Sequence, residues 1–292
     1  MIYLESFRLA SERDETDYLF DCRKLDMTCH NVNNPYPFKI FPFKNLSRLD
    51  FAPITLLYGG NGSGKSTILN IIAQKLKLTR TSPYSRTPFF EDYLKFCRAE
   101  LYHDKEPPEE SCIITSDDVF DFMLNFRTLN EGVDRKREEL FNEWYDLRQG
   151  GFQIRSLEDV EELQHRRDAW NSTRSDFTAR RIPKNLPGQS NGENAYGYFA
   201  EKIRGNALYL LDEPENSLSA ERQIELARFI EDSARFYGCQ FIISTHSPFL
   251  LAMKGARIYD LDTHPVETKK WTELSNVRLY HDFFEEHRKE FD

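Results

Sequence analysis

The chain alternates short apolar runs with stretches in which apolar residues recur at helical spacing. The apolar runs lie at residues 54–58, 112–115, 207–211 and 241–245, and polar or glycine-rich sequence follows each of them. Runs this short and this uniformly apolar are typical of strands buried on both faces of a parallel sheet. With helical patterns between them, they predict an α/β fold built on a layered, mostly parallel sheet. Such sheets bind ligands at the carboxyl ends of their strands.

Outside these runs the pattern is more varied. Residues 1–10 alternate apolar and polar side chains, which predicts a strand with one buried face. Residues 89–102 are helical or mixed in pattern, and a capped helix is expected from Ser116 to Phe126. An acidic, aromatic helix is expected within residues 272–292.

Between residues 130 and 183 the sequence becomes strongly charged while keeping helical spacing. Leu140, Trp144 and Leu147 are spaced by four and three, and the glycine pair at 150–151 interrupts a pattern that then resumes. This predicts two amphipathic helices folded back on each other as a hairpin, with a charged exterior that is either a solvated face or a partner-binding arm. The expected domains are therefore a core of residues 1–129 and 184–292 and a helical hairpin insertion of residues 130–183.

Length, charge and cysteine content exclude several classes of protein. With 292 residues, a net charge of −9 and a pI near 5.4, the chain is large enough for one α/β domain and too acidic for a general nucleic-acid coat protein. The five cysteines form no C-x-x-C pair, and Cys29-His30 has no second pair at zinc-ligand spacing, so reduced thiols of a cytoplasmic protein are expected. No apolar stretch approaches the length of a membrane span, so no membrane partner is expected.

A glycine-rich loop follows the apolar run at 54–58 and leads into a helical pattern. Its spacing is G-x-x-x-x-G-K-S, which in a strand-to-helix turn is the pattern of a phosphate-binding loop. The glycines let backbone N–H groups turn inward at a helix N-terminus, where they favour an anion. Lys65 is expected to reach the β- and γ-phosphates, and the Ser66 hydroxyl to ligate Mg²⁺. The residues expected to hold the nucleotide here are Gly59, Asn61, Gly62, Ser63, Gly64, Lys65, Ser66 and Thr67.

Two further strand ends carry side chains that could take part in catalysis. The run at 207–211 ends in Asp212 and Glu213, and the run at 241–245 ends in His246. Because the carboxyl ends of parallel strands meet at one edge of a sheet, these side chains are expected beside the glycine-rich loop. Asp212 is assigned to the Mg²⁺ shell opposite Ser66. Glu213 is assigned as the base that activates or orients the attacking water, and His246 as the group that contacts a γ-phosphate oxygen or that water.

These three segments resemble the Walker A, Walker B and switch-histidine elements of ABC-type ATPases. Residues 189–193 are similar to the signature motif of that superfamily, and within it the chain is most similar to small bacterial AAA-family predicted ATPases related to RecF, SMC and Rad50. The resemblance implies a P-loop NTPase fold of ABC-ATPase type, with N-terminal antiparallel strands beside the mostly parallel sheet. It also implies that Ser190 and Gly192 bind the γ-phosphate of an ATP held by a second subunit, as a helix N-terminus would. A head-to-tail homodimer would then complete two sites.

The sequence departs from the transporter pattern in two places. Ser219 stands where transporters usually carry the Asp that ends the D-loop, and no clear Q-loop glutamine follows the run at 112–115, where Ser116 or Asp117 stands instead. These departures concern signalling between two sites and the lining of the metal site.

The expected function is therefore that of an ATP-binding and ATP-hydrolysing switch, with ATP and Mg²⁺, which acts with a partner protein or DNA in a defence or DNA-maintenance role. The charge of the chain gives DNA no support. The alternative is an ATP-gated binding module or scaffold with very slow hydrolysis, against which Glu213 argues. A transporter subunit is weakened by Ser219, and a small-molecule kinase leaves Glu213, His246 and Ser190 unexplained.

Overall fold

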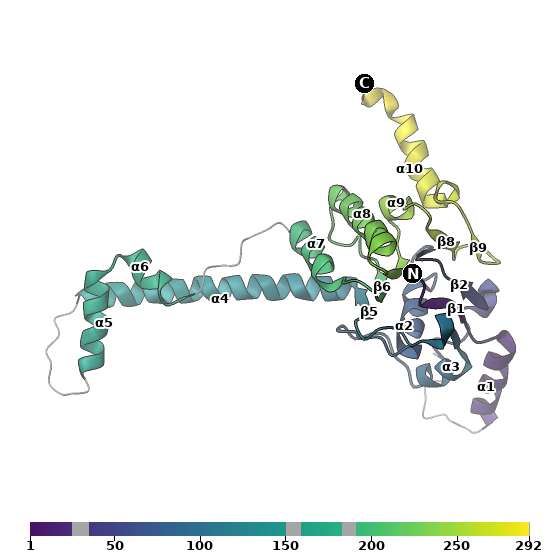
Figure 1. Cartoon of the computed structure of the whole chain (residues 1–292), viewed down its shortest axis with the longest axis horizontal. Coiled ribbons are helices and arrows are strands. Elements are labelled where there is room, and N and C mark those ends of the chain that lie inside the picture. The colour runs from purple at the N-terminus through teal and green to yellow at the C-terminus, as the bar shows by residue number, and fades with distance from the viewer. Residues whose placement is uncertain (25–34, 150–158, 183–190, 292) are drawn as a thin grey trace. The chain divides into compact units, whose positions relative to one another are not determined.

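The computed structural model describes residues 1–24, 35–149, 159–182 and 191–291. The chain divides into two compact units, one of residues 1–120 and 191–292 and one of residues 121–190. Figure 1 shows the elements of both, and each unit is described by itself.

A six-stranded sheet forms the centre of the first unit. Its order is β5-β6-β7-β3-β8-β9, and all neighbouring pairs are parallel except β8 and β9. Every residue of β3 and β7 is buried, which is why these segments read as continuous apolar runs. The mostly parallel sheet of the predicted fold class is thereby confirmed. The strands are β3 (Ile54–Tyr58), β5 (Cys112–Thr115), β6 (Leu208–Asp212), β7 (Gln240–Ser244), β8 (Arg257–Asp260) and β9 (Glu267–Thr268).

Helices cover the sheet. The side chains of Ile68, Leu69, Ile71 and Ile72 in α2 (Lys65–Lys75) are fully buried, and this helix contacts β5, β6 and β7. A helix buried on most of its surface holds the loop that precedes it in a fixed position. The helix α8 (Ala220–Phe236) lies beside α7 (Asn191–Lys202) and α9 (Pro248–Leu251) (Figure 1). The expected C-terminal helix is α10 (Ser275–Glu286).

A second, antiparallel sheet has the order β2-β1-β4, which confirms the N-terminal antiparallel strands. Its strands are β1 (Leu4–Arg8), β2 (Arg48–Asp50) and β4 (Arg98–Leu101). The buried side chain of Gln240 joins the two sheets, since its Oε1 accepts hydrogen bonds from the N–H groups of Tyr3 at 2.7 Å and Leu4 at 2.9 Å. Its amide also donates to the Leu4 carbonyl at 2.9 Å, so this one polar core residue is fully hydrogen-bonded.

The mixed stretch at residues 89–102 resolves into α3 (Phe90–Phe96) followed directly by β4. The helix α1 (Glu12–Lys24) was not expected, because its polar composition hides its few buried positions. The described residues of the first unit also form short 3-10 helices at Pro42–Lys44, Tyr102–Asp104, Trp271–Glu273 and Arg288–Glu290.

The second unit is helical. The helix α4 (Ser116–Gln149) begins in the first unit, where a capped helix was expected, and is 34 residues long, so that most of it belongs to the second unit. The helices α5 (Asp159–Asn171) and α6 (Arg174–Ala179) follow. A small buried cluster of Leu140, Ala169 and Phe177 joins the three helices. No helix in the part of the chain that the structure describes is long and apolar enough to cross a membrane.

Candidate functional site

The glycine-rich loop connects β3 to the N-terminus of α2, as its sequence predicts. Gly64 is the N-cap of α2 with φ 99°, and a Cβ at this position would lie 3.1 Å from the buried ring of Phe41. A Cβ at Gly59, whose φ is 154°, would lie 2.7 Å from the Ser63 hydroxyl oxygen. Glycine is therefore required at both positions by conformation and by space. Asn61 and Gly62 form the exposed turn between them.

Lys65 is the first residue of α2, and its side chain is buried within the loop with 4% of its surface exposed. Its ammonium group donates hydrogen bonds to the Gly59 carbonyl at 2.8 Å and to His246 Nε2 at 2.7 Å. The carboxylate oxygen Oε1 of Glu213 lies 3.7 Å from the same nitrogen. The loop thus holds a buried positive charge that contacts residues from two other strand ends.

Asp212 ends β6 and faces Ser66 in the first turn of α2. The Ser66 hydroxyl donates to Asp212 Oδ1 at 3.0 Å, and the hydroxyl of Ser244, at the end of β7, donates to the same oxygen. Burial raises the pKa of Asp212, and its hydrogen bonds from the two serines oppose this shift. A hydroxyl and a carboxylate in contact at the edge of the phosphate loop form the donor pair that Mg²⁺ takes alongside phosphate oxygens and waters.

Glu213 follows Asp212 in a left-handed conformation with φ 49°. Its N–H is held by Ser244, with the carbonyl oxygen 3.1 Å and the hydroxyl oxygen 3.0 Å away. This conformation is uncommon for a residue with a side chain, and here it turns the carboxylate toward His246, whose Nε2 lies 3.4 Å from Oε1. The other carboxylate oxygen accepts from the Asn216 amide at 3.1 Å.

His246 lies directly after β7 and is oriented by a buried carboxylate that the sequence did not single out. Glu215 Oε1 accepts from the backbone N–H of His246 at 2.6 Å and of Ser247 at 3.2 Å. Burial lowers the pKa of the His246 imidazole, and the neighbouring Lys65 ammonium lowers it further, so the ring is neutral at pH 7. Burial raises the pKa of Glu215.

The loop carries an unpaired group suited to a phosphate. The Ser63 hydroxyl is buried and has no hydrogen-bond partner within the described residues. Buried hydroxyls are normally paired, so one left open inside a phosphate-type loop fits a ligand that accepts hydrogen bonds. No group of three or more His, Cys, Asp or Glu side chains that could hold a metal occurs in the described residues. Ser66 and Asp212 would supply two oxygen ligands to a metal ion that takes its remaining ligands from phosphate and water.

Two side chains near the loop escaped the sequence analysis. Asp262, which follows β8, accepts from the Gly60 N–H through both oxygens, at 3.0 and 2.7 Å. Arg80 donates to the Asn70 side chain at 2.9 Å, and burial lowers the pKa of its guanidinium group, a shift that the carboxylate of Asp118 opposes. Neither lies in a motif, so only the sheet order could have revealed them.

The remaining predicted residues are placed as follows. Thr67 lies in the first turn of α2 and accepts a hydrogen bond from the Tyr36 hydroxyl at 3.2 Å. Gly192 is the second residue of α7, in agreement with a helix N-terminus at the signature-like stretch. Ser190 lies outside the described residues. The structure thus brings Lys65, Ser66, Asp212, Glu213 and His246 together from three strand ends.

Two segments of the chain match models of known protein families. Residues 38–169 match the family model described as "AAA domain", and residues 190–252 match the one described as "AAA domain, putative AbiEii toxin, Type IV TA system". No curated protein matches the chain.

Three solved structures similar to the chain share little sequence with it. The SMC head domain with an extended coiled coil bound to the C-terminal domain of ScpA, from Pyrococcus furiosus, is 14% identical over 99% of this chain and 100% of that chain, with a TM-score of 0.43. The SMC head domain from Thermotoga maritima is 15% identical over 77% of this chain and 92% of that chain, with a TM-score of 0.36. An ATP-binding cassette in a dimeric post-hydrolysis state bound to ADP and Pi is 16% identical over 78% of this chain and 90% of that chain, with a TM-score of 0.36.

The family models cover the glycine-rich loop, the carboxylate strand end and the histidine strand end that the geometry joins into one site. The chain is therefore similar to AAA-domain proteins over residues 38–169 and 190–252, the two segments that hold the site.

Proposed function

We propose that the chain binds and hydrolyses ATP and that it works as a switch which closes as a head-to-tail homodimer around two nucleotides. The observation that carries the proposal is the position of Glu213, whose Oε1 lies 3.7 Å from Lys65 Nζ and 3.4 Å from His246 Nε2. A carboxylate set between a buried ammonium group and a neutral imidazole supports proton transfer from a water that attacks a phosphate.

The residues have distinct roles in this reaction. When ATP binds, the Lys65 ammonium group exchanges its hydrogen bonds to backbone carbonyls and to His246 for hydrogen bonds to phosphate oxygens. Its three N–H donors allow this exchange. Glu213 accepts the proton of the attacking water, and the uncharged His246 orients that water or donates to a γ-phosphate oxygen. Ser66 and Asp212 would hold Mg²⁺, which neutralises phosphate charge when bound.

The dimer rests on the signature-like stretch. Each chain has one phosphate loop and one such stretch, and the latter leads into the N-terminus of α7. A helix N-terminus with a glycine in its first turn supports an anion contact. If Ser190 and Gly192 bind the γ-phosphate held by the other subunit, two-fold symmetry gives two equivalent sites.

A partner protein or DNA would bind differently to the closed and the open dimer, and the process served would be defence or DNA maintenance. The free thiols of Cys97, Cys112 and Cys239 support a cytoplasmic location. Affinity purification with the Glu213→Gln protein, which should remain closed with ATP, is the experiment that identifies the partner.

Phosphate release from ATP by the purified chain tests the proposed activity. Turnover that depends on Glu213 supports a switch. ATP binding without measurable turnover, with or without DNA, supports the second candidate, an ATP-gated binding module.

A further inference from the structure

Three arginines form a single row across the antiparallel sheet. In the register of β2-β1-β4, Arg8 pairs with Arg48 on one side and with Arg98 on the other. Residues paired across antiparallel strands project from the same face, and here all three are exposed while Phe7 and Leu49 are buried on the opposite face. The solvent face of this sheet therefore carries three adjacent guanidinium groups.

Like charges directly opposite one another destabilise a sheet, so the positive charges of the arginine row need nearby negative charges. Carboxylates of the next row of paired residues supply part of this negative charge. Glu100 lies 3.2 Å from Arg8 through Oε1 and 3.0 Å from Arg48 through Oε2, and Asp50 lies 2.8 Å from Arg48. Within the described residues Arg98 has no ion pair or hydrogen bond through its side chain. The compensation is therefore incomplete at one end of the row.

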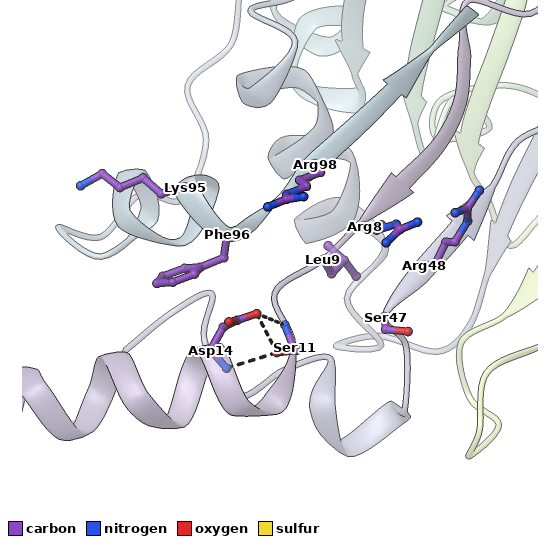
Figure 2. A pocket seen from close by; sticks show the side chains of 9 residues that line it. All are labelled: Arg8, Leu9, Ser11, Asp14, Ser47, Arg48, Lys95, Phe96 and Arg98. Carbon is purple, nitrogen blue, oxygen red and sulfur yellow. Dashed lines mark hydrogen bonds between the residues drawn. The ribbon is translucent and has the colours of Figure 1, made fainter.

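A hollow of about 460 Å³ lies at that end (Figure 2). Arg8, Arg48 and Arg98 line one side of it, and Lys95 and Phe96 lie beyond Arg98 with their side chains pointing away from the arginines. The Ser47 side chain adds a hydroxyl. Three arginine side chains thus line a space large enough for a nucleotide-sized molecule.

Two carboxylates lie at or near the hollow, and each has a hydrogen-bond or ion-pair partner. Asp14 lines it, but its Oδ2 accepts hydrogen bonds from the N–H of Ser11 at 3.1 Å and from the Ser11 hydroxyl at 2.6 Å, which caps α1. Asp92 pairs with Lys95 on the solvent side of α3. Each guanidinium group has five N–H donors, so the ion pairs of Arg8 and Arg48 leave donors free for an anion.

We propose that this hollow is a second ligand site, distinct from the glycine-rich loop, which binds the phosphate group of a small phosphorylated molecule. The phosphate contacts Arg8 and Arg98, whose planar forks match phosphate oxygens, and a flat apolar part of the ligand lies against Phe96. The ligand is small rather than a nucleic-acid strand, because a backbone continuing over the sheet would meet the carboxylates of Asp50 and Glu100.

The test uses the full chain with Lys65→Ala, which weakens nucleotide binding at the loop and leaves the hollow unchanged. The probes are AMP, inorganic pyrophosphate and a single-stranded oligonucleotide, titrated by calorimetry at low salt. AMP and pyrophosphate should bind at one saturable site, and adding Arg98→Ala should weaken both roughly tenfold or more. The matched control is Arg13→Ala, since the Arg13 side chain is 91% exposed and pairs with Asp17 at 3.7 Å.

Arg98→Lys gives a second measurement, because it keeps the positive charge and removes the planar guanidinium group. Its affinity for AMP and pyrophosphate should lie between that of the chain with Arg98 and that of the Arg98→Ala variant. Unchanged thermal unfolding of each variant shows that the fold is retained. Absence of saturable AMP and pyrophosphate binding overturns the site, as does equal weakening by Arg98→Ala and Arg13→Ala. Tighter binding of the oligonucleotide that also depends on Arg98 overturns the assignment to a small ligand.

Discussion

Substituting Glu213 by Gln removes a proton acceptor without changing the size of the side chain. The amide keeps an oxygen that can accept from Asn216, now 3.1 Å from the carboxylate, so the left-handed turn after β6 should persist. What changes is the charge beside Lys65 and His246. Glutamine cannot take a proton from water at neutral pH, so hydrolysis should fall while ATP binding survives.

The size of the effect follows from the Glu213–Lys65 distance and from the usual contribution of a general base. At 3.7 Å, the attraction between Glu213 and Lys65 is about 4 kcal/mol at an effective dielectric constant near 20, before the cost of desolvation. Losing it releases Lys65 toward phosphate, so ATP affinity should stay equal or increase. Loss of the general base should lower the hydrolysis rate by about 10²-fold or more, equivalent to about 2.7 kcal/mol in the activation barrier.

Phosphate release measures the hydrolysis rate, and light scattering after gel filtration measures whether the protein is a dimer. With ATP and Mg²⁺, Glu213→Gln should run as a dimer, and adding Ser190→Arg should return it to the state without nucleotide. The control is Glu221→Gln, an equal change at an exposed position in the first turn of α8, which should leave both readouts unchanged. If Glu213→Gln hydrolyses ATP at the wild-type rate, Glu213 is not the base and the assignment of the site is wrong.

Four further changes test other parts of the structure. Lys65→Ala should abolish ATP binding, and unchanged affinity in calorimetry would make the loop purely structural. Replacing residues 135–180 by a short glycine linker should leave a folded ATPase, because Leu140, Ala169 and Phe177 pack on one another, and an insoluble product would assign the hairpin to the core. Glu215→Ala should reduce hydrolysis roughly tenfold through loss of the acceptor at the His246 N–H, and Glu215→Gln, which retains an acceptor oxygen, should restore it. Burial raises the pKa of Glu15, which is 2% exposed, from 4.5 to about 7, so its contribution to stability is full below pH 4.5 and is lost as pH rises through 7. In urea unfolding, Glu15→Gln should therefore gain at most about 3 kcal/mol over wild type between pH 4.5 and 8, and an unchanged difference would show that the carboxyl titrates normally.

The local sequence was sufficient for β1, β3, β5, β6 and β7 and for grouping the core of the site, but not for β2, β4, β8 or β9. Continuous apolar runs mark β3, β6 and β7 because strands covered on both faces bury every side chain. Parallel strands present their carboxyl ends at one edge, so Lys65, Asp212 and His246 could be grouped before any contact was known. The unit boundaries and the roles of the site residues remain predictions.

Contacts between distant segments were decided only by the tertiary structure. Glu215 meets the His246 N–H, and Asp262 meets the Gly60 N–H, because β6 lies beside β7 and β8 beside β3. The arginine row likewise exists only in the register of β2-β1-β4, in which Arg48 and Arg98 stand on either side of Arg8. Strand order and register depend on packing over the whole core, and no pattern within a single segment contains them.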